Sequence, residues 1–324
     1  MAATAWGSGA GGESAARPAT ISSENGVHAT SGFREVPPEG WAEKQSEIRE
    51  AIVTTSDCNE WEAPRLPASA LVPNAKTSAA ATSLSSSSSR DSDDVAIILQ
   101  PRRPLRLIAG CDISFIKDDN VNALSALVVL TYPELNVVYS SFHDIELTEP
   151  YIPGFLAFRE AQHILDLIKE LRDKRPDLEP DCLLVDGNGL LHPRGCGLAC
   201  HLGVLADMPT IGIGKNLLYI DGLTKAKVKA WLAEEKKEGG DGTTSVLDGM
   251  QRKDLVGESG KTHGAAVAVA GVSTPIYVSV GHKVSLDTAV AVAIACSRHR
   301  IPEPVRQADL LSRDVLRKRA EMEN

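Results

Sequence analysis

Three acidic residues, Asp112, Glu160 and Asp186, occupy positions at which a carboxylate needs a chemical reason. Asp112 is embedded in the apolar run 105–115. Burying an uncompensated carboxylate is costly, so Asp112 must pair with a cation, bind a metal or be protonated. Glu160 lies on the apolar face of a predicted helix, and Asp186 ends the apolar run 182–185. If the three converge, their oxygen-only ligation suits Mg²⁺ or Mn²⁺.

Asp186 is followed at once by Gly187-Asn188-Gly189, which cannot continue a strand. In open α/β sheets ligands bind at the carboxyl ends of strands, and glycine lets the backbone approach a ligand closely. The alternative is that Asp186 only caps the next helix or begins a turn. Lys215 and His282 also follow an apolar strand and a glycine. We therefore expect both to join the three acids in one shared site.

The elements that must position these groups follow from periodicity. Three consecutive strands predict an antiparallel meander, and the β-α-β units after it predict parallel strands. The fold class is therefore α/β, with a mixed sheet flanked by helices. We expect strands at 105–115, 122–131, 135–143, 182–186, 210–214, 265–272 and 275–280, and helices at 41–53, 156–172, 197–205, 224–235 and 286–297.

Composition divides the chain into an extension and one domain. Residues 1–38 are rich in Ala, Gly, Ser and Thr and are expected to be disordered, whereas the domain spans 39–320. Within it, the Ser-rich segment 75–94 is predicted to be a flexible insertion, and the glycine-rich, charged segment 236–262 a flexible loop.

The net charge of −9 argues against a protein held on nucleic acid by bulk charge, although a local basic groove would be compatible with it. The basic flank 298–319 is interpreted as a solvated helix face. Six scattered cysteines indicate reduced thiols in an intracellular protein. Cys196, Cys200 and His201 could form a zinc site, but buried core residues are the better interpretation. No apolar run reaches the roughly 18 residues that span a bilayer, so no membrane is expected.

Taken together, the chain resembles the endonuclease V family, which has the ribonuclease-H-like fold. The resemblance runs over nearly everything from about 105 to 313, with support from Trp41 and Gln45. It implies a metal-dependent endonuclease that recognises inosine and cuts the phosphodiester one nucleotide beyond it on the 3′ side, leaving 3′-hydroxyl and 5′-phosphate ends. The matching blocks are AGCDISF (109–115), PYIPGFLAFRE (150–160), LLVDGNGLLHPRGCGLACHLGV (183–204), IGIGKNLL (211–218), YVSVGHKVSL (277–286) and RIPEPVRQADLLSR (300–313).

The same resemblance assigns catalytic roles. Asp112 and Asp186 match the family's metal-binding aspartates, and Glu160 matches its helix glutamate. Lys215 matches the catalytic lysine, and His282 the histidine after the last strand. The implied cofactor is Mg²⁺, with Mn²⁺ as a substitute.

Base recognition is implied for a second set of residues. The wedge that fills the gap left by a flipped base matches Pro150, Tyr151, Ile152 and Pro153. The pocket for hypoxanthine, formed largely by backbone, matches Leu156, Gly187, Gly189 and Leu218, with His192 beside it.

The expected partner is inosine-containing single-stranded RNA or DNA, bound by a monomer. Blocks such as RIPEPVRQADLLSR look like the eukaryotic branch of the family, which favours RNA, whereas PYIP is shared with the bacterial form. We therefore expect RNA to be preferred, in the cytoplasm, the nucleus or both, the nucleolus included. The alternatives are a DNA-repair endonuclease acting on deaminated bases, a junction resolvase of the same fold, and a non-catalytic inosine reader.

Overall fold

The computed structural model describes residues 36–56, 60–65, 102–116, 118–238, 251–268 and 274–322. By its contacts the chain divides into Met1–Val36 and Pro37–Asn324. Of the first unit only Val36 is described, and it is exposed. The predicted disordered extension, up to residue 35, and the Ser-rich insertion 75–94 lie outside the described residues.

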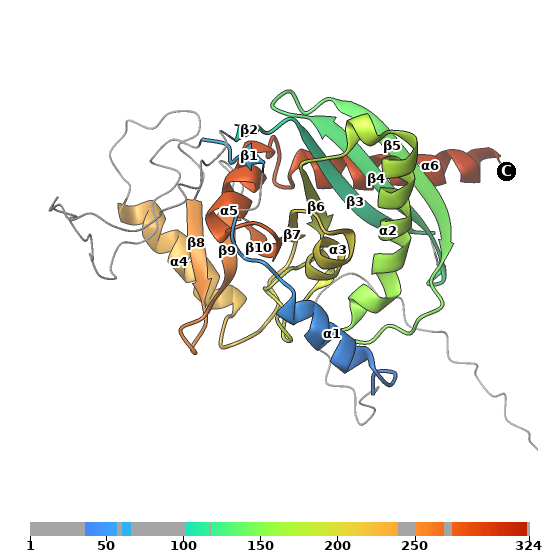
Figure 1. Cartoon of the computed structure of the whole chain (residues 1–324). Helices are drawn as coiled ribbons and strands as arrows, with labels where there is room; N and C mark the ends of the chain where they lie inside the picture. Colours follow the sequence, from blue (N-terminus) through green and yellow to red (C-terminus); the bar gives the residue numbers. More distant parts are fainter. Residues whose placement is uncertain are drawn as a thin grey trace, which may run out of the picture. The chain divides into compact units, whose positions relative to one another are not determined.

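A mixed eight-stranded sheet organises the second unit (Figure 1). Its strand order is β5-β4-β3-β6-β7-β10-β9-β8. β3, β6 and β7 are parallel, and every other neighbouring pair is antiparallel. This confirms the predicted meander followed by parallel strands. The strands are β3 Leu107–Phe115, β4 Asn122–Thr131, β5 Val137–Glu146, β6 Cys182–Asp186, β7 Thr210–Gly214, β8 Gln251–Val256, β9 Thr262–Ala268 and β10 Ile276–His282; β1 Trp61–Glu62 and β2 Arg103–Pro104 form a separate parallel pair.

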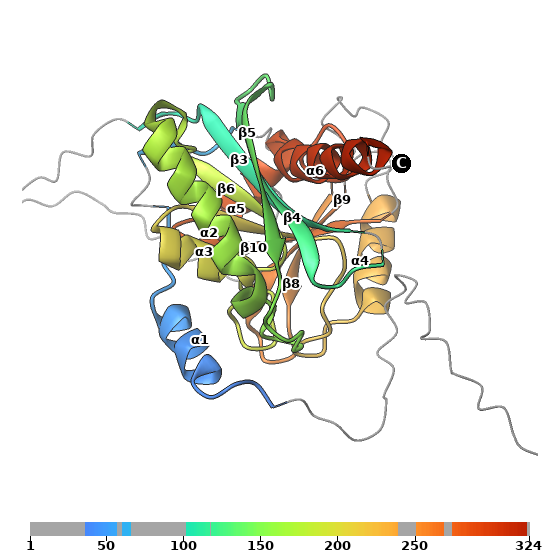
Figure 2. The ribbon, with the colours of Figure 1, turned by 90° about the vertical axis from the view of Figure 1, so that its right-hand side faces the viewer.

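Helices cover both faces of the sheet, which explains why its central strands are continuous apolar runs without alternation. α2 (Leu156–Lys174) and α3 (Leu198–Ala206) pack on one face. α5 (Leu286–Ala295) and α6 (Glu303–Met322) pack on the other. Figure 2 shows α2 and α6 on opposite sides of β3 and β4. Among the described helices, none is long and apolar enough to cross a membrane.

The early helix α1 (Trp41–Glu50) packs beside α2 and α3. The Trp41 ring stacks on Phe158 of α2 with 4.6 Å between centroids. Ile48 is buried against Cys196 and Cys200, which are therefore core residues as the sequence indicated. These contacts join α1 to α2, to α3 and to the loop that precedes α3.

Two parts of the chain differ from the sequence prediction. The segment 236–262 is not one loop, because α4 (Lys225–Glu238) extends into it and Gln251–Val256 forms the edge strand β8. Charged residues hide the strand pattern there, since an edge strand has few buried positions. The basic C-terminal flank forms α6, whose apolar stripe is buried against β3 and β4 and is not simply a solvated face.

Candidate active site

The parallel strands bring two of the predicted acids side by side. Register pairs Cys111 of β3 with Val185 of β6, so the next residues lie side by side: Asp186 ends β6, and Asp112 lies within β3, which continues to Phe115. Side chains alternate along a strand, and the face that receives Asp112, Asp186 and Lys215 is the one that α6 covers. A cavity of about 380 Å³ lies at this point. Its lining is Asp112, Ile113, Ser114, Phe115, Asp186, Lys215, Asp309 and Arg313.

Burial and mutual repulsion dominate the electrostatics of the carboxylates. The pKa of Asp112 is raised to about 7 by burial, then by the charge of Asp186 and a hydrogen bond with it. The pKa of Glu160 is also raised to about 7, by burial and then by the charges of Asp112 and Asp186. Glu160 is therefore within electrostatic reach of both aspartates, although it comes from α2 and is not among the residues that line the cavity. The three predicted acids form one electrostatic group.

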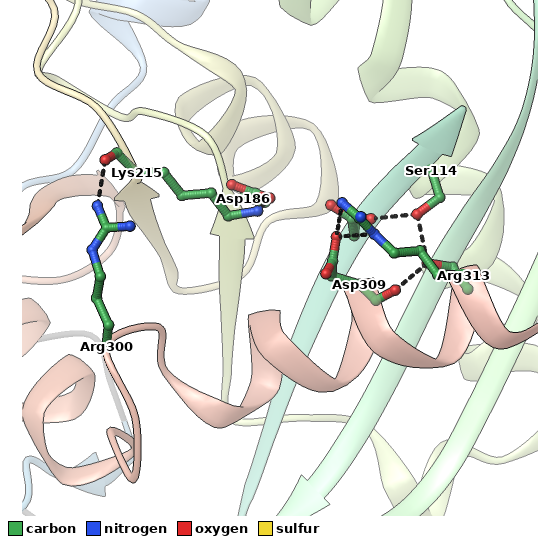
Figure 3. A network of polar contacts seen from close by, with 8 residues as sticks. Ser114, Asp186, Lys215, Arg300, Asp309 and Arg313 are labelled. Carbon is green, nitrogen blue, oxygen red and sulfur yellow. Dashed lines mark hydrogen bonds and ion pairs between the residues drawn. The ribbon is translucent and has the colours of Figure 1, made fainter. Parts of the chain in front are cut away.

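Lys215 places a cation next to this group. Its Nζ donates to Asp186 Oδ2 at 2.6 Å. Burial alone would lower the pKa of Lys215, but the charge of Asp186 and this hydrogen bond outweigh it and the pKa is raised. Arg300 holds the backbone, donating to the Lys215 carbonyl at 2.6 Å (Figure 3). Lys215 is therefore a protonated, anchored cation at the mouth of the site.

Asp309 of α6 is an acid of this site that sequence reasoning missed. Its carboxylate accepts from Arg313 Nε at 2.9 Å, and its charge contributes to the raised pKa of Asp112 (Figure 3). Ser312, one helical turn further, contacts Ser114 at 2.7 Å, and Ser114 donates to Asp112 at 3.0 Å. The sequence did contain a signal for Asp309. Like Glu160 in α2, it is an acid next to the buried apolar residues of its helix, such as Ala308.

The donor set fits a hard divalent cation by its chemistry. Its members are carboxylates whose mutual repulsion and burial disfavour ionisation, the condition that a bound cation relieves. Across the ranges that the structure describes, no three metal-binding side chains are arranged closely enough to hold an ion as they stand. The cations of Lys215 and Arg313 are paired with Asp186 and Asp309 in that arrangement.

His282 does not join this group, and its predicted place in the shared site is wrong. The prediction assumed that every strand has its carboxyl end at the same end of the sheet, which holds only for parallel strands. β10 runs antiparallel to β7 and pairs His282 with Thr210, the first residue of β7, whereas Lys215 follows its last residue. His282 is buried and its Nδ1 accepts from the Val53 backbone at 3.2 Å. At this opposite end of the strands, His282 holds the segment after α1 through the Val53 hydrogen bond.

Beside the carboxylates lies a second cavity of about 260 Å³, open to the wedge segment. It brings together six predicted recognition residues: Tyr151, Pro153, Leu156, Gly187, His192 and Leu218. Pro150 and Ile152 are outside its lining, and Ile152 is buried. Tyr151 is 63% exposed. The lining also includes Asp186, predicted for the metal site, and residues that sequence reasoning did not assign to this pocket: Gln45, Gly154, Ala157, Asn188, Pro193, Cys196, Gly197 and Leu198.

Gly189 is not a pocket residue, which corrects the prediction. It lies under β10, where its N–H donates to Ser279 Oγ at 2.9 Å. A Cβ at this position would come within 2.0 Å of the Val280 carbonyl oxygen. Gly189 is therefore needed for backbone packing beneath the pocket.

His192 is the polar side chain of the lining that is placed to read a ligand. Burial, reinforced by the charges of His201 and Arg194, lowers the pKa of His192 to about 4, so its ring is neutral at neutral pH. Its Nδ1 accepts from the Arg194 backbone at 3.3 Å, which leaves Nε2 as a donor. The Asn188 Oδ1 finds no hydrogen-bond partner in the described part of the chain, but it is buried against Gly214 and offers no surface to the pocket.

Carboxylates and a lysine gathered on parallel strands, beside a second cavity, are typical of a nuclease that acts on phosphodiester bonds. The family model for endonuclease V matches residues 92–310. The chain therefore belongs to the endonuclease V family.

Individual relatives agree with this assignment. Human endonuclease V is 47% identical over 215 residues, which cover 66% of this chain and 73% of the relative. The crystal structure of human ENDOV superposes with a TM-score of 0.65 at 38% identity, covering 86% of this chain and 98% of that chain. Endonuclease V of Ciona intestinalis, crystallised with a 24-mer DNA containing an inosine followed by a ribo-adenosine, has a TM-score of 0.66 at 33% identity, covering 86% and 97%.

Proposed function

We propose that this protein is a metal-dependent endonuclease that binds a flipped hypoxanthine and hydrolyses the phosphodiester one nucleotide to its 3′ side. The products are 3′-hydroxyl and 5′-phosphate ends. One observation carries the proposal: Asp186 lines both the cavity that holds Asp112 and Lys215 and the second cavity, here called the recognition pocket, that holds Tyr151 and His192. A base bound in the pocket therefore has its own strand's backbone beside the acids, which supports cleavage near the recognised nucleotide.

Asp112, Glu160 and Asp186 would hold Mg²⁺, or Mn²⁺ in its place, and Asp309, which lines the same cavity as the two aspartates, would add a fourth carboxylate. When bound, the ion supplies Lewis-acid charge at the scissile phosphate. The Lys215 ammonium is 2.6 Å from Asp186 and offsets negative charge that develops on the phosphate oxygens.

Recognition would depend on the wedge and the neutral pocket. Flipping a base costs a few kcal/mol, and stacking on an aromatic ring recovers roughly 1–3 kcal/mol. The exposed ring of Tyr151 is suited to that contact. Hypoxanthine presents an oxo group and an N–H on the edge where adenine presents an amino group and a bare nitrogen. The His192 Nε2 donor complements the hypoxanthine oxo group.

We propose single-stranded RNA as the preferred substrate. The relative from Ciona, bound to an inosine followed by a ribonucleotide, supports a role for ribose on the 3′ side of the lesion. The rest of that strand is DNA, which keeps repair of deaminated bases in DNA as the alternative.

An intracellular monomer is proposed for the working form, in the cytoplasm, the nucleus or both. The five described cysteines are all buried free thiols, which supports a reducing compartment.

The test compares cleavage of matched single-stranded RNA and DNA oligonucleotides that carry one inosine, in Mg²⁺. The wild type should cut both, and RNA faster. Asp112→Ala should lose cutting on both, because it removes a carboxylate from the centre of the acidic group. Asp173→Ala, which removes an exposed acid of α2, should cut like the wild type.

Wild-type cutting by Asp112→Ala would discredit the metal centre. A DNA rate well above the RNA rate would favour the repair function. Equal cutting of inosine and adenosine oligonucleotides would remove the lesion specificity.

A further inference from the structure

Gln45 of α1 is a buried polar side chain that the chemistry above does not use. It is 1% exposed and lines the recognition pocket, the cavity that also holds Tyr151 and His192. It also precedes residues 92–310, which the family model matches. A buried amide outside the catalytic part of the chain needs partners, and those partners indicate what it does.

Its hydrogen bonds reach two different loops. Nε2 donates to the Gly154 carbonyl at 3.0 Å and to the Cys196 carbonyl at 2.8 Å. Oε1 accepts from Arg194 Nε. The partners fix the orientation of the amide, because carbonyls only accept and a guanidinium only donates. Both amide hydrogens are used, so Gln45 has no free N–H to donate to a ligand in the pocket.

The two loops are the ones that recognition requires. Gly154 closes the wedge segment that carries Tyr151, and Cys196 and Arg194 belong to the loop after Asp186. Both loops line the pocket. Arg194 strengthens the connection, since its guanidinium lies 4.9 Å from the Phe155 ring centroid and donates to the Ala42 carbonyl at 3.2 Å. Gln45 thus hydrogen-bonds both the end of the wedge, at Gly154, and the loop between Asp186 and α3, here called the pocket loop, to helix α1.

We propose that Gln45 is a positioning residue that sets the distance between the wedge and the pocket loop, and through it the discrimination of inosine from adenosine. The inference rests on the proposed function and adds α1 to the recognition apparatus. Pocket width decides discrimination because hydrogen bonds to a base edge weaken steeply when the donor and acceptor move apart.

Two substitutions of similar length separate the hydrogen bonds from the packing. Gln45→Glu turns a carboxylate toward two carbonyl oxygens and removes both donors. Gln45→Met removes every hydrogen bond and buries no charge. Lys44→Ala is the matched control, because it truncates a neighbouring, exposed side chain of the same helix.

The full chain and these variants are titrated, in Ca²⁺ to support binding without cutting, against fluorescent single-stranded RNA with one inosine and its adenosine counterpart. Thermal unfolding is measured in parallel, and binding is compared well below each melting temperature. Both Gln45 variants should bind the inosine strand about tenfold more weakly, the equivalent of one lost net hydrogen bond. Their affinity for the adenosine strand should not change, and Lys44→Ala should match the wild type.

An unchanged inosine-to-adenosine ratio in Gln45→Met would overturn the role of Gln45, and this variant decides the matter where Gln45→Glu does not fold. An equal loss on both strands would also overturn it, because that pattern reports general damage. If the wild type itself did not prefer inosine, the proposed function would fail instead, so the two failures are distinguishable.

Discussion

At the residue scale, the chemistry depends on carboxylates held in surroundings that favour their protonated form. Asp112 is 8% exposed and lies beside Asp186, and both burial and repulsion oppose its ionisation. Ser114 works in the other direction by donating to the carboxylate. A divalent cation would reverse the balance, since it favours the charged form of every ligand around it. Without a metal ion, the ionised form of Asp112 is therefore destabilised by burial and by the charge of Asp186, and a bound divalent cation would remove this cost.

This cost makes the metal-free protein less stable as pH rises. The pKa of Asp112 is about 3.9 when unfolded and about 7 when folded, so the folded state holds its proton more tightly. The resulting stability is complete below pH 4 and is lost as pH rises through 7. We expect Asp112→Asn, which cannot ionise, to gain melting temperature relative to the wild type between pH 5 and pH 8 in EDTA.

Thermal unfolding in EDTA at the two pH values measures this difference. Asp173→Asn, an exposed acid of α2, should follow the wild type at both. A constant offset between Asp112→Asn and the wild type would show that Asp112 is not an energetic burden in the folded state.

At the element scale, α6 matters because it brings Asp309 onto the face of the sheet that holds Asp112. The helix can approach β3 so closely because position 110 carries no side chain. A Cβ on Gly110 would come within 2.0 Å of the Pro304 carbonyl oxygen, at the start of α6. The lack of a side chain on one strand thus decides where an acid nearly 200 residues away in sequence is placed.

Gly110→Ala should therefore move α6 and damage the active site. We expect a loss of stability of about 1–3 kcal/mol, the usual cost of overpacking, together with at least about tenfold slower cleavage in Mg²⁺. Chemical denaturation and single-turnover cleavage measure the two effects. Ser140→Ala, a change of similar size on the exposed side of β5, should leave both unchanged. Full activity in Gly110→Ala would mean that α6 does not need this contact to place Asp309.

At the scale of the whole molecule, the acidic group joins parts of the chain that are far apart in sequence. Asp112 comes from β3, Glu160 from α2, Asp186 from β6 and Asp309 from α6. An ion held there would stabilise the packing of both helices against the sheet.

Mg²⁺ should therefore raise the melting temperature of the protein. A ligand that binds only the folded state stabilises it by about 2.7 kcal/mol at a hundred times its dissociation constant. The effect should be larger at pH 8 than at pH 5, because protons compete for the raised carboxylates at the lower pH. Asp186→Asn should abolish most of the shift. An equal shift in that variant would indicate binding elsewhere on the acidic surface.

The amino-acid sequence by itself determined the chemistry of the site. Acids in apolar runs are conspicuous wherever the chain folds, and the apolar runs also identified the central strands. Only the tertiary structure decided which polar residues meet. It excluded His282, because strand direction depends on pairing and not on local pattern. It added Asp309, because α6 can approach β3 only where Gly110 has no side chain. It added Gln45, because the hydrogen bonds of this residue are made to loops far away in the sequence.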